Sequence, residues 1–162
     1  MRHAKSAYPL GVADHDRPLS GRGLRDASAA QLWFSDHGAE ILSQDPCVLV
    51  STALRTQQTW QAIQSGLPTA TVQHEPRIYE AAVSTLIDVC APSVSAGKDT
   101  LLIGHNPGVE GLADFLADPT TRPDVWAQRE KCPTAAIVVL EILDDSWAGA
   151  SAIISDFIVP RG

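Results

Sequence analysis

The 162-residue sequence lacks long apolar runs, paired cysteines and clusters of basic residues. Its longest apolar runs, such as Ala135–Leu140, fall far short of the roughly 20 residues that a membrane-spanning helix needs. The three cysteines form neither a CxxC pair nor a zinc-binding spacing. Twelve Lys and Arg stand against 19 Asp and Glu, and the net charge of −7 disfavours a nucleic-acid surface. We therefore expect no membrane segment, no disulfide and no nucleic-acid partner.

The N-terminal residues Met1–Ser6 are basic, but no apolar segment of the kind found in signal peptides follows them. The sequence therefore predicts a cytoplasmic protein whose cysteines are reduced and mostly buried. With 44% hydrophobic and 19% charged residues, the composition is that of a globular protein. The length predicts a single domain that spans residues 1–162.

Short apolar strands alternate with amphipathic segments along the chain. Cys47–Ser51 and Thr100–Gly104 have the composition of buried strands, and three further strands are expected at 71–73, 135–142 and 152–158. Helices are expected at 20–37, 54–64 and 83–90, and from Pro107 onward. This order predicts an α/β fold of three layers, α/β/α, in which helices cover both faces of a mainly parallel central sheet.

Several local signals set the expected helix bounds. Ser20 is a favourable N-cap for the first helix, and Gly38 and Pro92 are expected to end the first and third helices. The apolar face of the first helix is expected to consist of Leu24, Ala27, Ala30 and Phe34. The helix after Pro107 is expected to point four side chains inward: Val109, Leu112, Ala113 and Leu116.

Arginine and histidine side chains follow the chain start and the two clear strands. Arg2 and His3 open the sequence. Arg55 follows the first strand, and His105 follows the second. Ligands of open α/β sheets bind at the carboxyl ends of the strands, so these side chains are expected to converge. Arginine forks hold phosphoryl oxygens, and a histidine beside them can act as nucleophile, acid–base group or hydrogen-bond donor.

Ordered segments around these residues carry recognisable motifs. The first three are Arg2–Ser6 (RHAKS), Asp16–Gly23 (DRPLSGRG) and Ser51–Thr59 (STALRTQQT). Three more follow along the chain: Ile78–Ala81, Gly104–Gly108 and Pro133–Ala136. Together they resemble the motifs of the histidine phosphatase superfamily, and in particular its SixA-type phosphohistidine phosphatases. The resemblance covers about residues 2–141 and implies a phosphoglycerate-mutase-like fold.

The resemblance also implies a reaction that needs no cofactor and no metal ion. His3 would attack phosphorus and become a phosphohistidine, which water would then hydrolyse. Three side chains would hold the phosphoryl oxygens during transfer: Arg2, Arg55 and His105. The substrate would be phosphohistidine on a protein, or a related phosphoramidate.

Three other residues are candidates for the site. Glu80 lies where other branches of the family place a general acid, and an ordinary loop glutamate is an equal alternative. Arg17 would either reach the pocket rim or pin the 7–21 loop through Asp14 or Asp16. Asn106 is expected to contact substrate. The remaining histidines are expected to be solvated: His15, His37 and His74.

Three other functions remain open at this point. A phosphomonoesterase for a small metabolite would need Glu80 to protonate the leaving oxygen. A pseudophosphatase would only bind phosphorylated ligands, but the intact arginines and histidines argue against it. A metalloenzyme that uses His3 and His105 is disfavoured, because the neighbouring arginines would repel a divalent cation.

The chain also lacks an apolar strand before Arg2, which the resemblance places in the middle of the sheet. We expect the first strand to be truncated and translation to start upstream of Met1. The truncation is expected to leave His3 poorly anchored, or a gap between Cys47–Ser51 and Thr100–Gly104. Unpaired backbone groups beside such a gap would each destabilise the fold by about 1–3 kcal/mol.

Overall fold

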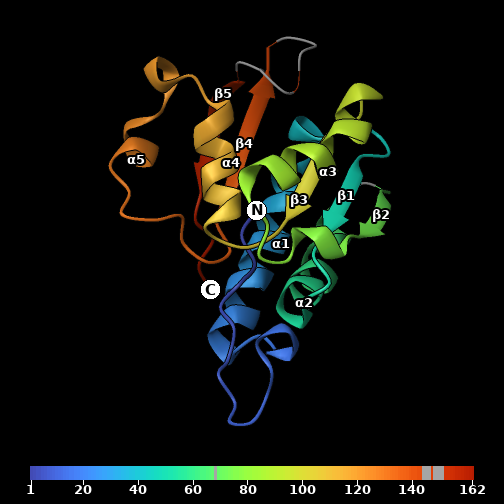
Figure 1. Cartoon of the computed structure of the whole chain (residues 1–162), viewed down its shortest axis with the longest axis vertical. Helices are drawn as coiled ribbons and strands as arrows, with labels where there is room; N and C mark the ends of the chain where they lie inside the picture. Colours follow the sequence, from blue (N-terminus) through green and yellow to red (C-terminus); the bar gives the residue numbers. More distant parts are fainter. Residues whose placement is uncertain (68, 144–146, 148–151) are drawn as a thin grey trace.

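The fold is described from a computed structural model, which covers residues 1–67, 69–143, 147 and 152–162. A parallel sheet at its centre has the strand order β2-β1-β3, formed by Thr71–His74, Cys47–Val50 and Thr100–Ile103. A separate antiparallel pair joins β4 (Ile137–Ile142) to β5 (Ala152–Ile158). Figure 1 shows the two sheets on opposite sides of the N-terminus.

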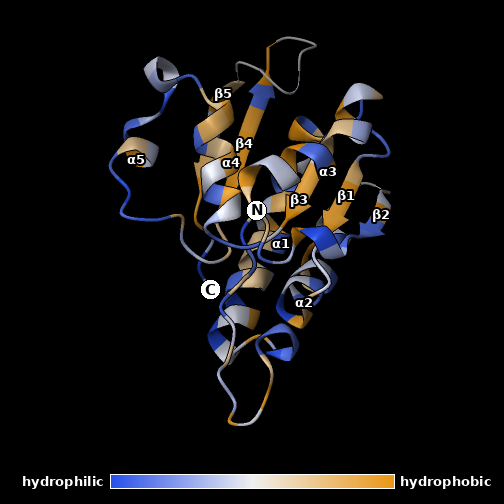
Figure 2. Ribbon diagram, viewed as in Figure 1, coloured by the Kyte–Doolittle hydropathy of each residue, from blue (hydrophilic) through white to orange (hydrophobic). Residues whose placement is uncertain are grey.

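Helices cover both faces of the parallel sheet. Val48, Val50 and Ile103 pack on the side of α1 (Gly21–Ile41) and α2 (Leu54–Ile63). Leu49 and Leu102 pack on the side of α3 (Val83–Ser95) and α4 (Gly108–Leu116). The apolar residues of β1 and β3 contrast with the hydrophilic edge strand β2 (Figure 2). The three-layer α/β/α architecture expected from the sequence is confirmed.

Shorter elements complete the described fold. They are the 3₁₀ turns Asp14–Asp16, Gln64–Gly66, Pro76–Ile78 and Pro119–Thr121, and the helix α5, Asp124–Ala127. None of the described helices combines the length and the apolar character needed to cross a bilayer.

The expectation that Gly38 ends the first helix is wrong, because α1 continues to Ile41. Gly38 is buried inside α1, and a Cβ there would lie 3.2 Å from the carbonyl oxygen of Gly66. This glycine therefore permits close packing between α1 and the turn after α2. Leu24, expected on the buried face, is 53% exposed, whereas Ala27, Ala30 and Phe34 are buried as expected. Ser20 caps the helix by accepting a hydrogen bond from Gly23 N–H.

Pro92 does not end α3, which continues through it to Ser95. Pro92 lacks the N–H that would donate to the carbonyl oxygen of residue 88. The helix nevertheless continues, because the hydrogen bonds of its last turn are still formed. Ala96 N–H donates to Pro92 O, and Gly97, whose φ is +69°, completes the turn. The inward face of α4 is as expected, with Val109, Leu112, Ala113 and Leu116 all buried.

The expectation of a gap between Cys47–Ser51 and Thr100–Gly104 is also wrong. β1 and β3 pair residue by residue from Cys47–Thr100 to Val50–Ile103. Residues Met1–His3 instead lie on the other side of β3, where His3 N–H donates to Gly104 O and Arg2 N–H donates to Ala136 O. His3 is therefore firmly anchored, with 8% of its surface exposed.

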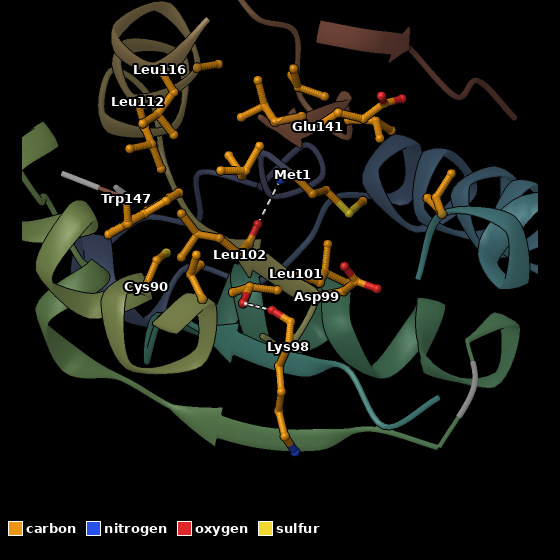
Figure 3. Close-up of a pocket in the computed structure, with 18 of the residues that line it drawn as sticks. Met1, Cys90, Lys98, Asp99, Leu101, Leu102, Leu112, Leu116, Glu141 and Trp147 are labelled. Carbon is orange, nitrogen blue, oxygen red and sulfur yellow. Dashed lines mark hydrogen bonds between the residues drawn. The ribbon is translucent and has the colours of Figure 1, made fainter. Parts of the chain in front are cut away.

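A cavity of about 930 Å³ lies beyond Met1, between β3 and β4. Its walls include Leu101 and Leu102 of β3, Val138 to Leu140 of β4, and Leu112 of α4. The terminal ammonium of Met1 donates to Leu102 O over 2.7 Å at the inner end of this cavity (Figure 3). The parallel sheet and the β4–β5 pair are therefore joined through Met1–His3 but separated beyond it.

In the 162-residue chain with a free amine at Met1, the burial of this amine predicts a pH-dependent stability. Burial lowers the pKa of the Met1 amine from 8.0 to about 6. Between pH 8 and pH 6 the unfolded chain binds the proton first, so acidification through this window favours unfolding, by on the order of 2 kcal/mol. Thermal melts should show the loss.

A chain acetylated at Met1 is the control, because it cannot titrate there while the other groups are shared. An identical loss of stability between pH 8 and pH 6 in the acetylated chain would contradict the assignment.

Candidate active site

His3 lies at the centre of the site with one ring nitrogen fixed. Its Nδ1 is 2.7 Å from the carbonyl oxygen of Ala4, so the Nδ1–H donates and Nε2 retains the lone pair. Burial, aided by the charges of Arg55 and Arg2, lowers the pKa of His3 to about 4. The ring is therefore neutral at pH 7, with Nε2 available as a nucleophile.

His105 follows β3 and lies beside His3, with 5.1 Å between the ring centroids. Its Nε2 is 2.8 Å from the hydroxyl of buried Ser51, at the end of β1. Burial, followed by the neighbouring His3 and Arg55, lowers the pKa of His105 to about 3. If the Ser51 hydroxyl donates to Nε2, the proton of the neutral ring is on Nδ1, which is buried and has no partner among the described residues. That N–H can donate to an oxyanion.

Three arginines surround the histidines. Arg55, in the first turn of α2, is buried, and Arg2 donates from Nη1 to Cys132 O over 2.6 Å. Arg17 holds the loop after His3 through bonds to Ala7 O, Asp14 and Ser6. The structure thus uses Arg17 to pin the 7–21 loop.

The chain positions this loop by a close approach between Lys5 and α1. A Cβ at Gly23 would lie 2.0 Å from Lys5 O, so only glycine fits there. Ser20 N–H and its hydroxyl both donate to the same carbonyl. The segment that carries His3 is therefore tied to the start of α1.

The loop brings residues to the site that the sequence analysis missed. The Asp14 carboxylate accepts from Arg55 and from the hydroxyl of Tyr79. His15, expected to be solvated, is 3.0 Å from the Thr52 hydroxyl and packs edge-on against Tyr79. The sequence indicates Asp14 only as a partner of Arg17, because no periodicity or strand end marks a residue on such a loop.

Glu80 and Asn106 both line the open pocket of about 540 Å³ that leads to Arg55 and His105. Glu80 is exposed and has a φ of +53°, in the left-handed region that non-glycine residues rarely adopt. The Asn106 side-chain N–H groups donate to Glu110 and to Cys132 O. Its amide nitrogen is thus engaged within the fold, whereas its Oδ1 is buried and has no hydrogen-bond partner among the described residues.

The side chains of the site suit an anion. Its histidines are surrounded by arginines, and no group of three or more His, Cys, Asp or Glu side chains in the described part of the chain is arranged to hold a metal ion. Arginine forks beside a neutral histidine suit a phosphoryl group.

Comparison with known proteins decides the family. The family model described as "Histidine phosphatase superfamily (branch 1)" matches residues 1–87. The chain belongs to the histidine phosphatase superfamily. A Mycobacterium tuberculosis protein is 40% identical to it over 167 aligned positions, covering 99% of this chain and 100% of the relative. A Mycobacterium leprae protein is 37% identical, with the same coverage of both chains.

Solved structures agree with this membership and support a phosphatase activity. A chain from Nakamurella multipartitia, named as a candidate phosphohistidine phosphatase SixA, has a TM-score of 0.82 and 26% identity. The match covers 100% of this chain and 94% of that one. A similar candidate SixA from Agrobacterium tumefaciens has a TM-score of 0.74 and 26% identity, covering 99% and 95%. The expected SixA-type resemblance is confirmed.

Replacement of Arg55 by lysine tests whether Arg55 holds the phosphoryl oxygens in this histidine phosphatase. A lysine keeps the charge but cannot present two donors in a planar fork, so we expect turnover to fall roughly 100-fold. Steady-state rates would be compared with those of Arg22→Lys, a control at an exposed arginine that pairs with Asp26. A near-wild-type rate for Arg55→Lys would remove Arg55 from the site.

Proposed function

We propose that this protein hydrolyses phosphohistidine, on a protein or in a small phosphoramidate, through a phosphohistidine intermediate on His3. The observation that carries the proposal is the state of His3. Its Nδ1–H is tied to Ala4 O and its ring is neutral, so Nε2 presents a free lone pair beside the arginines. A buried, desolvated neutral imidazole is a competent nucleophile.

In the first step the Nε2 lone pair of His3 attacks phosphorus. The bond between phosphorus and the leaving nitrogen breaks, and that nitrogen keeps the electron pair. Arg2, Arg55 and the Nδ1–H of His105 stabilise the negative charge on the phosphoryl oxygens. Ser51 acts through His105 in this proposal: a hydroxyl that donates to Nε2, 2.8 Å away, leaves the ring proton on Nδ1, where it can be donated to the phosphoryl group.

In the second step water attacks the same phosphorus. The bond to His3 Nε2 breaks, inorganic phosphate leaves and the neutral imidazole is restored. The fixed arginines supply positive charge in both steps, so the proposal includes neither a metal ion nor a cofactor. A cytoplasmic location fits this substrate class and remains part of the proposal.

The leaving group decides whether a general acid is needed. The imidazole of phosphohistidine leaves as a neutral amine once solvent has protonated its ring. An alkoxide is a much poorer leaving group, and proton donation to it contributes typically 10²–10⁴-fold. Glu80 is therefore dispensable for a phosphoramidate and required for an ester.

A small-molecule phosphomonoesterase is the second candidate function. The observation that favours it is Glu80, which lines the open pocket and holds an unusual backbone conformation with φ +53°. Outliers of this kind occur often at functional sites. The pseudophosphatase alternative is less favoured, because His3, the arginines and His105 are all present in the chain.

A comparison of substrates tests the proposal. Rates would be measured on a phosphohistidine protein, on phosphoramidate and on alkyl phosphate esters, for wild type and Glu80→Gln, with EDTA present throughout. We expect turnover of the phosphoramidates, little effect of Glu80→Gln on them and no effect of EDTA. Any ester hydrolysis should fall roughly 100-fold or more in Glu80→Gln.

Glu130→Gln, at an exposed glutamate, is the matched control. Fast hydrolysis of esters only, sensitive to Glu80→Gln, would replace the first function by the second. Activity that is lost in EDTA and returns with a divalent cation would contradict the metal-independent mechanism.

A further inference from the structure

The carboxylate of Asp14 lies among the arginines of the anion site. Its Oδ2 accepts from Arg55 Nη2 at 3.0 Å and from the Tyr79 hydroxyl at 2.8 Å, and its Oδ1 accepts from Arg17 Nη1. The backbone oxygen of Asp14 also accepts from Arg55 Nη1 at 2.6 Å. A carboxylate with these contacts has the charge and the planar oxygen pair that an arginine fork recognises.

Asp14 is charged under all ordinary conditions. The Tyr79 hydroxyl, with Arg17 and Arg55, lowers the pKa of Asp14 to about 2. The two histidines beside it are neutral, and Asp14 is the carboxylate that pairs with Arg55 among the described ion pairs. Its side chain is nevertheless 48% exposed and borders the open pocket.

We infer that Asp14 competes with the phosphoryl group for Arg55 and thereby sets the affinity of the site for phosphoryl anions. This inference rests on the proposed function, because it takes the arginine cluster as the phosphoryl site. A bound phosphoryl group adds negative charge beside a carboxylate, and such like-charge pairs weaken binding. Asp14 therefore favours release of inorganic phosphate after the second step.

The geometry allows the Asp14 carboxylate to give up its hydrogen bond to Arg55 while the 7–21 loop stays in place. Arg55 keeps its bond to the Asp14 backbone oxygen, whatever side chain residue 14 carries. Arg17 retains Ala7 O and Ser6, and His15 retains Thr52. Only the bonds to the carboxylate itself need to be exchanged for phosphoryl oxygens.

Titration with inorganic phosphate tests this inference without any measurement of turnover. Calorimetry would give the dissociation constant for wild type, Asp14→Asn and Asp14→Ala. Removal of the negative charge should tighten phosphate binding about tenfold in both variants. The inhibition constant of phosphate in the phosphoramidate assay should fall in parallel.

Asp16→Asn is the matched control, since Asp16 is on the same turn, is 72% exposed and contacts only His15 among the described ion pairs. It should bind phosphate as wild type does. Unchanged or weaker binding by folded Asp14→Asn and Asp14→Ala would overturn the inference, and weaker binding would make Asp14 a support for Arg55. Failure of every chain to bind phosphate would instead remove the anion site and the proposed function with it.

Discussion

The active site depends on the hydrogen bonds that hold Met1–Ala4 between the two sheets. His3 N–H donates to Gly104 O, and its own carbonyl accepts from Ala135 N–H. The next amide, that of Ala4, donates to the Thr59 hydroxyl of α2. Partners more than fifty residues away thus fix the backbone of His3, the proposed nucleophile. Because this segment also joins β3 to β4, the position of His3 and the integrity of the fold rest on the same contacts.

In the site, burial keeps the histidines neutral, and the arginines supply the fixed positive charge. Desolvation suppresses protonation of His3 and His105, and the arginines add to this effect. Arginine itself stays charged at any physiological pH. The proposed nucleophile, neutral His3, therefore lies next to permanent cations, which is the combination that attack on an anionic phosphoryl group requires. Asp14 balances part of that positive charge through its ion pairs with Arg55 and Arg17.

The sequence predicts what depends on local pattern and on strand order. Arg55 and His105 follow apolar strands, and parallel strands bring their carboxyl ends to one edge, so their convergence was predictable. The role of Gly38 could not be predicted. In the sequence, a glycine that ends a helix cannot be distinguished from one that allows a neighbouring backbone to pack closely. The prediction of a gap between β1 and β3 was wrong for a related reason. The edge of β3 on which Met1 lies depends on the topology of the sheet, which the local sequence pattern does not determine. The place of Asp14 in the site could not be predicted, because Asp14 lies on a loop and the path of a loop leaves no periodic pattern in the sequence.

The most direct test of the account is to locate the phosphoryl group on the enzyme during a single turnover. Excess enzyme would be mixed with labelled phosphoramidate, quenched in alkali, and analysed by peptide mass spectrometry and phosphorus NMR. We expect an acid-labile phosphoryl group on Nε2 of His3, absent from His3→Ala. A phosphoryl group on another residue, or normal phosphate release by His3→Ala, would contradict it.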